Sequence, residues 1–275
     1  MSTTDNLVIL VVSVVVSTIL VALTIAFGAR KKTLQSLGIQ WLQAMRMMLM
    51  HLQLHRGLSS AYLAGDVASK PKIDSVRTQI SSDICNISSI GEWVNNNQNW
   101  LGITQHWARL SAGNLGADQE KNFNQHCRLI GSVLAMLDET AQQHLLENKS
   151  RYGNIKFIWH ELLYLAELIG QTRALGVQQL SLRKQSHLLN KNRVMIQKSL
   201  VEIEELMSQP ACQRKITGKD SQSIFGFIEY VKIHLVDNLG QLSVSEYFIL
   251  ASNTMEVIYE CFDQEIQKLQ RKVKY

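Results

Sequence analysis

An uncharged, apolar run from position 7 to position 27, LVILVVSVVVSTILVALTIAF, constrains this chain more than any other feature. A run of this length crosses the hydrocarbon core of a bilayer as one helix. The residues before it include Asp5 and no Lys or Arg, unlike the basic start of a cleaved signal peptide. We therefore expect an anchor that stays attached and contacts membrane lipid through residues 7–27.

Three basic residues, Arg30, Lys31 and Lys32, follow the run directly. Basic residues next to a membrane helix stay on the cytoplasmic side. The sequence therefore predicts a single-pass protein of the cytoplasmic membrane whose larger part faces the cytoplasm. We divide the chain into a tail, anchor and basic stop over residues 1–32 and one soluble region over residues 33–275.

The composition of the soluble region favours an all-α fold. Pro71 and Pro210 are the two prolines of the 275-residue chain, and long stretches are rich in Leu, Gln, Glu, Lys and Ala. The net charge of +5 is spread among acidic residues rather than gathered in one run, so we expect no nucleic-acid partner. The four cysteines, Cys85, Cys127, Cys212 and Cys261, lie far apart and are expected to be single thiols.

Apolar residues spaced alternately by three and four predict long antiparallel helices. We expect them near residues 34–66, 72–98, 118–147, 152–187, 190–208, 220–237 and 243–272, with a further short helix within 100–110. Breaks are signalled by Gly65, by the glycines from 113 to 116, by Pro210 and by Ser243. Helices this long are typical of two stacked helical bundles that share them.

Two arginines occupy apolar positions of these helices. Arg56 continues the line of Leu49 and Leu52, and Arg173 continues that of Ala166 and Ile169. Glycines lie beside both arginines: Gly57 follows Arg56, and Gly170 and Gly176 lie one turn before and after Arg173. A glycine inside a helix costs about 1 kcal/mol relative to alanine, so their presence needs an explanation.

We interpret the pattern as a small anion-binding cavity walled by Arg56 and Arg173, with Gly57, Gly170 and Gly176 leaving the room. A guanidinium group offers parallel N–H donors to two oxygens of a planar oxyanion. Two unpaired cations roughly 6 Å apart repel by about 3 kcal/mol at an effective dielectric of 20, and a bound anion removes that repulsion. Helix repacking on binding is then within the range of allosteric ligands.

Two alternatives remain open from the sequence. Each arginine could pair with a buried carboxylate, for which Glu161, Glu167 and Glu246 are available. Alternatively, both guanidinium groups could extend outward and leave their charge in water.

The local sequences resemble the nitrate- and nitrite-sensing NIT domains. The segment HLQLHRGLSSAYLAGD, residues 51–66, is similar to the first motif of that family, and ELIGQTRALGVQQL, residues 167–180, to its second. The ending VSEYFILASNTMEVIYECFDQ, residues 244–264, is similar to the closing helix. His55 departs from the family, which usually has an acid there, and Lys232 is a further basic candidate.

The resemblance implies a bacterial sensor of two helical bundles that binds nitrate or nitrite through Arg56 and Arg173, without a cofactor. Family members usually join this domain to an output module such as an RNA-binding antiterminator or a histidine kinase. No such module is visible here, so the signal is expected to leave through a separate signalling protein, a homodimer or the anchor.

Other functional classes find less support in the sequence. His51 and His55 stand four residues apart and could share a metal ion, but no third ligand is evident, so we expect no metal. The sequence has no nucleophile elbow and no phosphate-binding glycine loop, so we expect no enzyme. The rival is a membrane-anchored helical scaffold without a ligand. The five tryptophans are expected to be packing residues: Trp41, Trp93, Trp100, Trp107 and Trp159.

Overall fold

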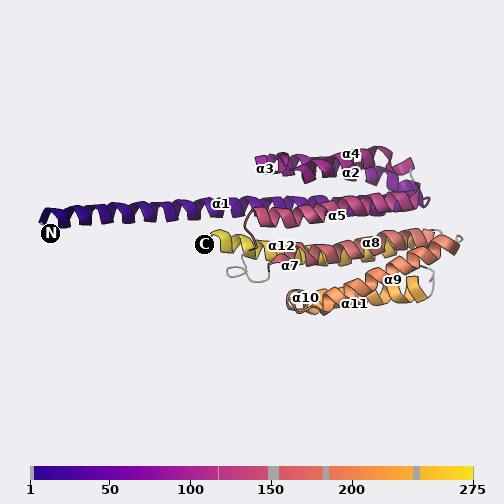
Figure 1. The fold of residues 1–275 in the computed structure, drawn as a ribbon. Helices are drawn as coiled ribbons and strands as arrows, with labels where there is room; N and C mark the ends of the chain where they lie inside the picture. The colour runs from indigo at the N-terminus through magenta and orange to yellow at the C-terminus, as the bar shows by residue number, and fades with distance from the viewer. Residues whose placement is uncertain (1–2, 117, 148–154, 182–185, 238–241, 275) are drawn as a thin grey trace.

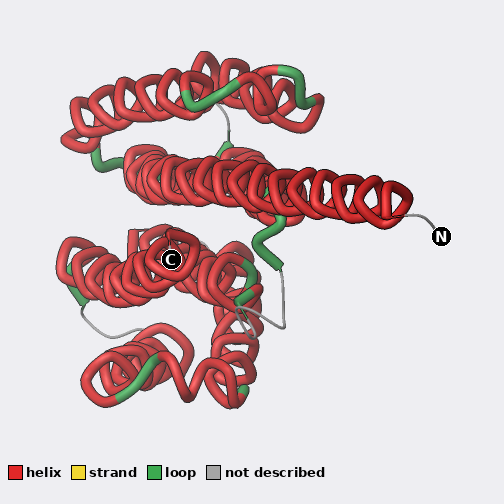
Figure 2. The backbone as a smooth tube through the Cα atoms, turned by 90° about the vertical axis from the view of Figure 1, so that its left-hand side faces the viewer, coloured by secondary structure: helices red, strands yellow, loops and turns green. Residues whose placement is uncertain are grey.

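The computed structural model describes residues 3–116, 118–147, 155–181, 186–237 and 242–274. All regular structure in these ranges is helical, so the predicted all-α fold is confirmed. The helices form two stacked bundles, seen as layers in Figure 1 and again after a quarter turn about the vertical axis in Figure 2.

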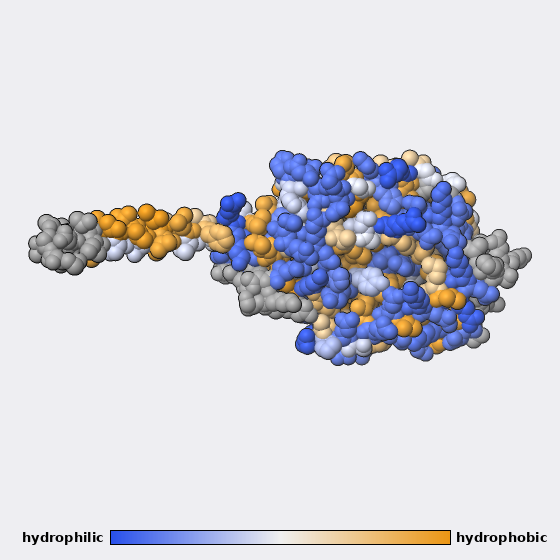
Figure 3. Space-filling view, in the orientation of Figure 1, coloured by the Kyte–Doolittle hydropathy of each residue, from blue (hydrophilic) through white to orange (hydrophobic). Residues whose placement is uncertain are grey.

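The anchor and the first soluble helix are one unbroken helix, α1 (Thr3–Leu63), where we expected two separate elements. No proline interrupts this stretch, and the hydroxyl of Thr33 donates to the carbonyl of Ala29 within the helix at 3.1 Å. Apolar side chains from Leu10 to Phe27 project into solvent, which gives the stalk of Figure 3. By length and composition, α1 can cross a membrane. It ends before Gly65, whose φ of +107° suits glycine.

The first bundle combines the C-terminal half of α1 with α2 (Lys70–Ser89), α4 (Gln98–Gly113) and α5 (Gln119–Gln143). The helix expected over 72–98 is shorter than predicted, and the four-residue α3 (Glu92–Asn95) follows it. The reason is Trp41, whose indole N–H donates to the carbonyl of Ile87 at 3.0 Å. A side chain at Gly91 would meet the Trp41 ring at 3.3 Å. The indole thus ends α2.

The second bundle contains α8 (Glu161–Ser181), α9 (Ser186–Ser208), α11 (Gly218–Val231) and α12 (Val244–Lys274). Short helices precede or join them: α7 (Lys156–Trp159), α10 (Pro210–Lys215) and the π-helical η3 (Lys232–Asp237). The helix predicted over 152–187 is therefore divided near His160, and its first residues lie outside the described ranges. The break predicted at Pro210 is confirmed, because α9 ends at Ser208, and Pro210 begins the short helix α10, which we did not predict.

The two bundles meet where α1 packs against α8 and α12. The apolar lines predicted from the sequence face this interior: Leu42, Met45, Leu49 and Leu52 on α1 are fully buried. On α12, Ala251, Met255, Ile258 and Phe262 are also buried. The site residues lie on these three helices, so the stacking of the bundles positions them.

Candidate functional site between the bundles

Arg56 is fully buried on α1 and pairs with Glu167 of α8. Its two terminal nitrogens donate to the two carboxylate oxygens, at 2.5 Å for Nη1–Oε1 and 3.0 Å for Nη2–Oε2. Nη1 also lies 3.3 Å from the sulfur of Cys127 on α5. Of the carboxylates that the sequence offered, Glu167 is the one that forms this buried ion pair.

Glu167 is held by further donors besides the arginine. The side-chain amides of Gln53 and Gln171 each donate to one of its oxygens at 2.9 Å. The hydroxyl of Tyr259 on α12 donates in turn to the side-chain carbonyl of Gln53. A network from three helices therefore satisfies a planar, two-oxygen anion at the junction of the bundles.

Arg173, one and a half turns further along α8, is nearly as deeply buried, with 3 % of its surface exposed. Nη1 donates to the hydroxyl of Ser252 and Nη2 to the backbone carbonyl of Gln53, each at 2.8 Å. The ring of Phe248 lies 4.8 Å from its guanidinium carbon. Among the described residues, no carboxylate lies within ion-pair distance of Arg173.

Burial lowers the pKa of Arg173 to about 10, and the positive charge of Arg56 adds to this effect. Its Nε–H, like that of Arg56, has no hydrogen-bond partner within the described part of the chain. Arg173 is thus a buried cation balanced by neutral groups, whereas Arg56 is paired with the carboxylate of Glu167. Among the described residues, the two arginines therefore differ in that no carboxylate neutralises the charge of Arg173.

Each arginine lies over the glycine of the other helix. A side-chain carbon at Gly170 would come within 2.8 Å of Nη2 of Arg56, and one at Gly57 within 3.3 Å of Nε of Arg173. At Gly176 it would collide with the ring of Tyr247, at 2.4 Å. The space beside these glycines is filled by side chains of the protein itself.

Two buried histidines lie beside Arg56 on its first-bundle side. His55 and His126 contact through Nδ1 and Nε2 at 2.8 Å, and Nδ1 of His126 donates to the carbonyl of Asn122 at 2.8 Å. Burial lowers the pKa of His55 to about 2 and that of His126 to about 3. His51 instead contacts Asp83 at 2.6 Å, so His51 and His55 do not share a ligand.

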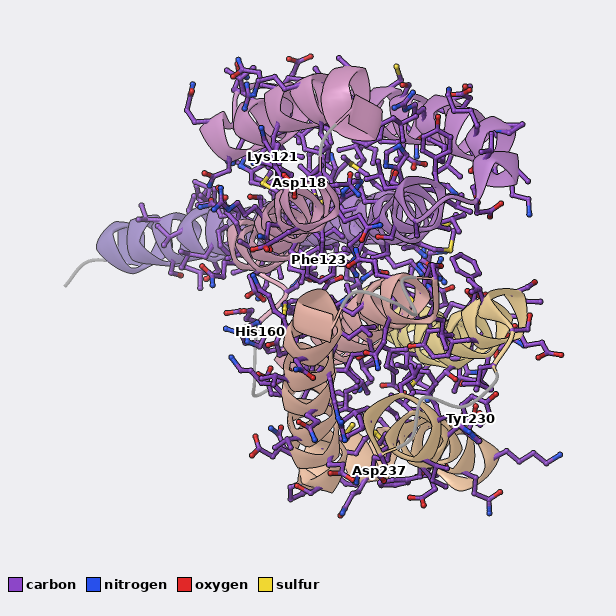
Figure 4. The ribbon with its side chains drawn as sticks, turned by 90° about the vertical axis from the view of Figure 1, so that its right-hand side faces the viewer. Asp118, Lys121, Phe123, His160, Tyr230 and Asp237 are labelled. Atoms are coloured by element: carbon purple, nitrogen blue, oxygen red, sulfur yellow. The ribbon has the colours of Figure 1, made fainter. Side chains whose placement is uncertain are left out.

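Phe123 of α5, labelled in Figure 4, closes this side of the site with its ring 5.6 Å from the guanidinium carbon of Arg56.

Lys232 does not join the site, because its amine pairs with Glu204 at 2.5 Å. Trp41, Trp100, Trp107 and Trp159 are buried packing residues, and Trp93 is partly buried. The four cysteines are free thiols.

The sequence reasoning missed Gln53, Tyr247, Ser252 and Tyr259. Tyr247 and Tyr259 stand four residues before Ala251 and four after Met255, so the apolar line of α12 could have included them. The hydroxyl of Tyr247 donates to the carbonyl of Thr172 at 2.7 Å. Gln53 and Ser252 carry no such signal, because polar residues at these spacings usually face water.

No family model matches this chain, and no curated protein matches it. Among solved structures, the fold is similar to one described as the structure of the NasR transcription antiterminator. The TM-score is 0.67 and the identity is 12 %, and the match covers 94 % of this chain and 74 % of the other. The likeness establishes a shared arrangement of helices over almost the whole chain.

Proposed function

We propose that this protein is a membrane-anchored sensor that binds nitrate or nitrite where α1, α8 and α12 meet. The observation that carries the proposal is Arg173, a guanidinium group buried to 97 % beside a second arginine and without a carboxylate of its own among the described residues. Burying an uncompensated charge is costly, and a small anion would remove that cost. The resemblance of both arginine motifs to NIT domains supports nitrate or nitrite as that anion.

Glu167 supports the same chemistry from within the protein. A carboxylate and a nitrite ion are both planar, with two oxygens that share one negative charge, and Arg56 holds the carboxylate by two hydrogen bonds. In our proposal the anion binds first to Arg173 and then competes with Glu167 for Arg56. Release of Glu167 changes the contact between α1 and α8, which is the repacking that carries the signal.

In our proposal, α1 anchors the protein so that this event takes place at a membrane. The apolar half of α1 supports a single span, and the basic residues after it support a cytoplasmic bundle region in a bacterial inner membrane. The signal passes to a separate signalling protein or to a second copy of the chain. The fold shared with a transcription antiterminator agrees with the NIT family, whose sensor domain serves such an output.

The test is the thermal unfolding of the full chain in detergent micelles with sodium nitrate, nitrite, chloride or sulfate at equal ionic strength. A ligand at a hundred times its Kd stabilises the folded state by about 2.7 kcal/mol, which raises the midpoint by several degrees. We expect nitrate or nitrite to do so, and chloride not to. A midpoint that rises equally with chloride would refute the proposal.

Variants locate the binding. Arg173→Met and Arg56→Met should each abolish the nitrate shift, whereas Arg109→Met, at an exposed position of α4, should keep it. If the shift survives both core variants, the anion binds elsewhere.

One observation favours a second candidate, a ligand-free scaffold. The complete pairing of Arg56 with Glu167 stabilises the stacked bundles without any anion. A scaffold would show no anion-specific shift in the wild type and none in Glu167→Gln. The sensor should bind nitrate more tightly in Glu167→Gln, because the internal competitor has lost its charge.

A further inference from the structure

The middle of α1 and the C-terminal end of α12 meet directly below the apolar stalk. α1 brings three basic residues to this level and α12 brings three more in its last turn: Arg30, Lys31, Lys32, Arg271, Lys272 and Lys274. The amine of Lys32 donates to the backbone carbonyl of Lys274 at 3.1 Å, which holds the two helices together at this level. In Figure 3 strongly hydrophilic residues lie where the stalk joins the bundles.

A cavity of about 230 Å³ lies between α1 and the end of α12 at this level. Its exposed lining carries the amines of Lys32 and Lys274, together with the partly exposed amide of Gln270. Its buried lining is formed by Ile39 and Val273. The cationic and polar donors at its mouth suit an anionic group.

The cavity lies at the depth of lipid headgroups if the stalk spans a membrane. Lys32 follows Phe27, the last residue of the apolar run, by five residues, which is about 7 Å along an α-helix. The headgroup layer on each side of the hydrocarbon core is about 5–7 Å thick. Glu265, the acidic residue that precedes this turn on α12, already pairs with Lys215 and Lys268.

We propose that the basic middle of α1 and the C-terminal end of α12 bind the headgroups of anionic phospholipids, with one headgroup bridging Lys32 and Lys274. The inference rests on the membrane anchoring in the proposed function. Basic residues near an anionic bilayer surface each strengthen the attraction about fivefold. A bridging lipid fixes the end of α12, and the same helix carries Ser252 and Phe248 beside Arg173. Lipid and anion would thus act on opposite ends of one helix.

The test compares the full chain in nanodiscs of phosphatidylcholine alone with nanodiscs that also contain phosphatidylglycerol. Amide hydrogen exchange over residues 267–274 reports how firmly the last turns of α12 are held, and native mass spectrometry counts the retained lipids. We expect phosphatidylglycerol to slow exchange there about fivefold or more. The variant Arg271→Gln/Lys272→Gln/Lys274→Gln should lose this slowing and retain fewer anionic lipids.

A charge-matched control, Lys72→Gln/Arg109→Gln/Lys219→Gln, removes three exposed basic residues elsewhere on the described surface and should behave as the wild type. Equal exchange in both nanodiscs, or equal loss in the control, would overturn the inference. Slowing by inorganic phosphate in phosphatidylcholine nanodiscs would also overturn it, because the site would then take free phosphate. Release of the chain from vesicles by an alkaline carbonate wash would instead contradict the anchoring itself.

Discussion

The surroundings of Arg56 and Arg173 differ although the two residues lie on the same interface. Arg56 donates to a carboxylate that three helices hold in place, whereas Arg173 donates to a hydroxyl and a backbone carbonyl. The first arrangement neutralises the buried charge and stabilises the stacked bundles. The second retains a charge that no carboxylate among the described residues neutralises, at a cost in stability. The comparison teaches that two similar motifs can place one paired arginine and one arginine without a counter-ion at the same interface.

Removing Glu167 should have the largest effect, because it leaves Arg56 as the second uncompensated cation. We expect Glu167→Leu to lower the free energy of unfolding by about 3–5 kcal/mol. Chemical denaturation of the full chain in micelles measures it. The double variant Arg56→Met/Glu167→Leu should recover most of the loss, since apolar replacement of a buried pair is often neutral. A loss of under about 1 kcal/mol in Glu167→Leu would mean that the pair does not stabilise the interface.

Acid should lower the free energy of unfolding through the two buried histidines beside Arg56, His55 and His126. The folded state holds the pKa of His55 near 2 and that of His126 near 3, below their usual 6.5, so only the unfolded chain takes up these protons on mild acidification. Stability is therefore present above pH 6.5 and is lost as the pH falls toward 3. Each histidine contributes a slope of about 1.4 kcal/mol per pH unit. Chemical denaturation between pH 6 and pH 4 gives the slope of the free energy of unfolding against pH. In His126→Gln this slope should be smaller by the contribution of one histidine, about 1.4 kcal/mol per pH unit. An unchanged slope would contradict the buried neutral pair.

Alanine substitutions at Gly170 and Gly57 should differ in their cost to stability, because Gly170 lies against Arg56 and Gly57 lies against Arg173. Gly170→Ala places a carbon 2.8 Å from an Arg56 nitrogen that Glu167 holds in place, and we expect a cost of about 1–3 kcal/mol. Gly57→Ala meets the ring of Phe248 at 3.0 Å and Nε of Arg173 at 3.3 Å, and it should cost less. Gly131→Ala, in an open position of α5, is the matched control and should gain up to about 1 kcal/mol. Equal effects at Gly57 and Gly131 would show that Phe248 and Arg173 move aside without cost.

Arg173→Met should have the smallest effect on stability. Methionine of similar length removes a buried charge and leaves the hydroxyl of Ser252 and one backbone carbonyl to find other partners. We expect a change within about 1 kcal/mol of the wild type in either direction, by the same denaturation measurement. A loss as large as that of Glu167→Leu would show that Arg173 has a strong internal partner after all.

Periodicity predicted most of the helices and the burial of both arginines, because a line of residues three and four apart specifies which side of a helix faces the core. It could not choose among Glu161, Glu167 and Glu246, since Arg56 and Glu167 are 111 residues apart and their pairing depends on how the bundles stack. Trp41 likewise ended α2 through a contact between separate helices. The division of the predicted 152–187 helix near His160 could not be predicted, because no glycine or proline lies beside that position.

The unbroken course of α1 has a mechanical consequence. A helix of 61 residues is a rod about 90 Å long, and Arg56 lies about 40 Å from the end of its apolar run. With no proline to act as a joint, a turn imposed at Arg56 reaches the stalk as the same turn rather than as a bend. If α1 slipped by one residue against the helices packed on it, it would rotate by about 100° and shift by about 1.5 Å along its axis. In the proposed membrane-anchored sensor, rotation of α1 about its axis, rather than bending, would connect the two bundles to the bilayer.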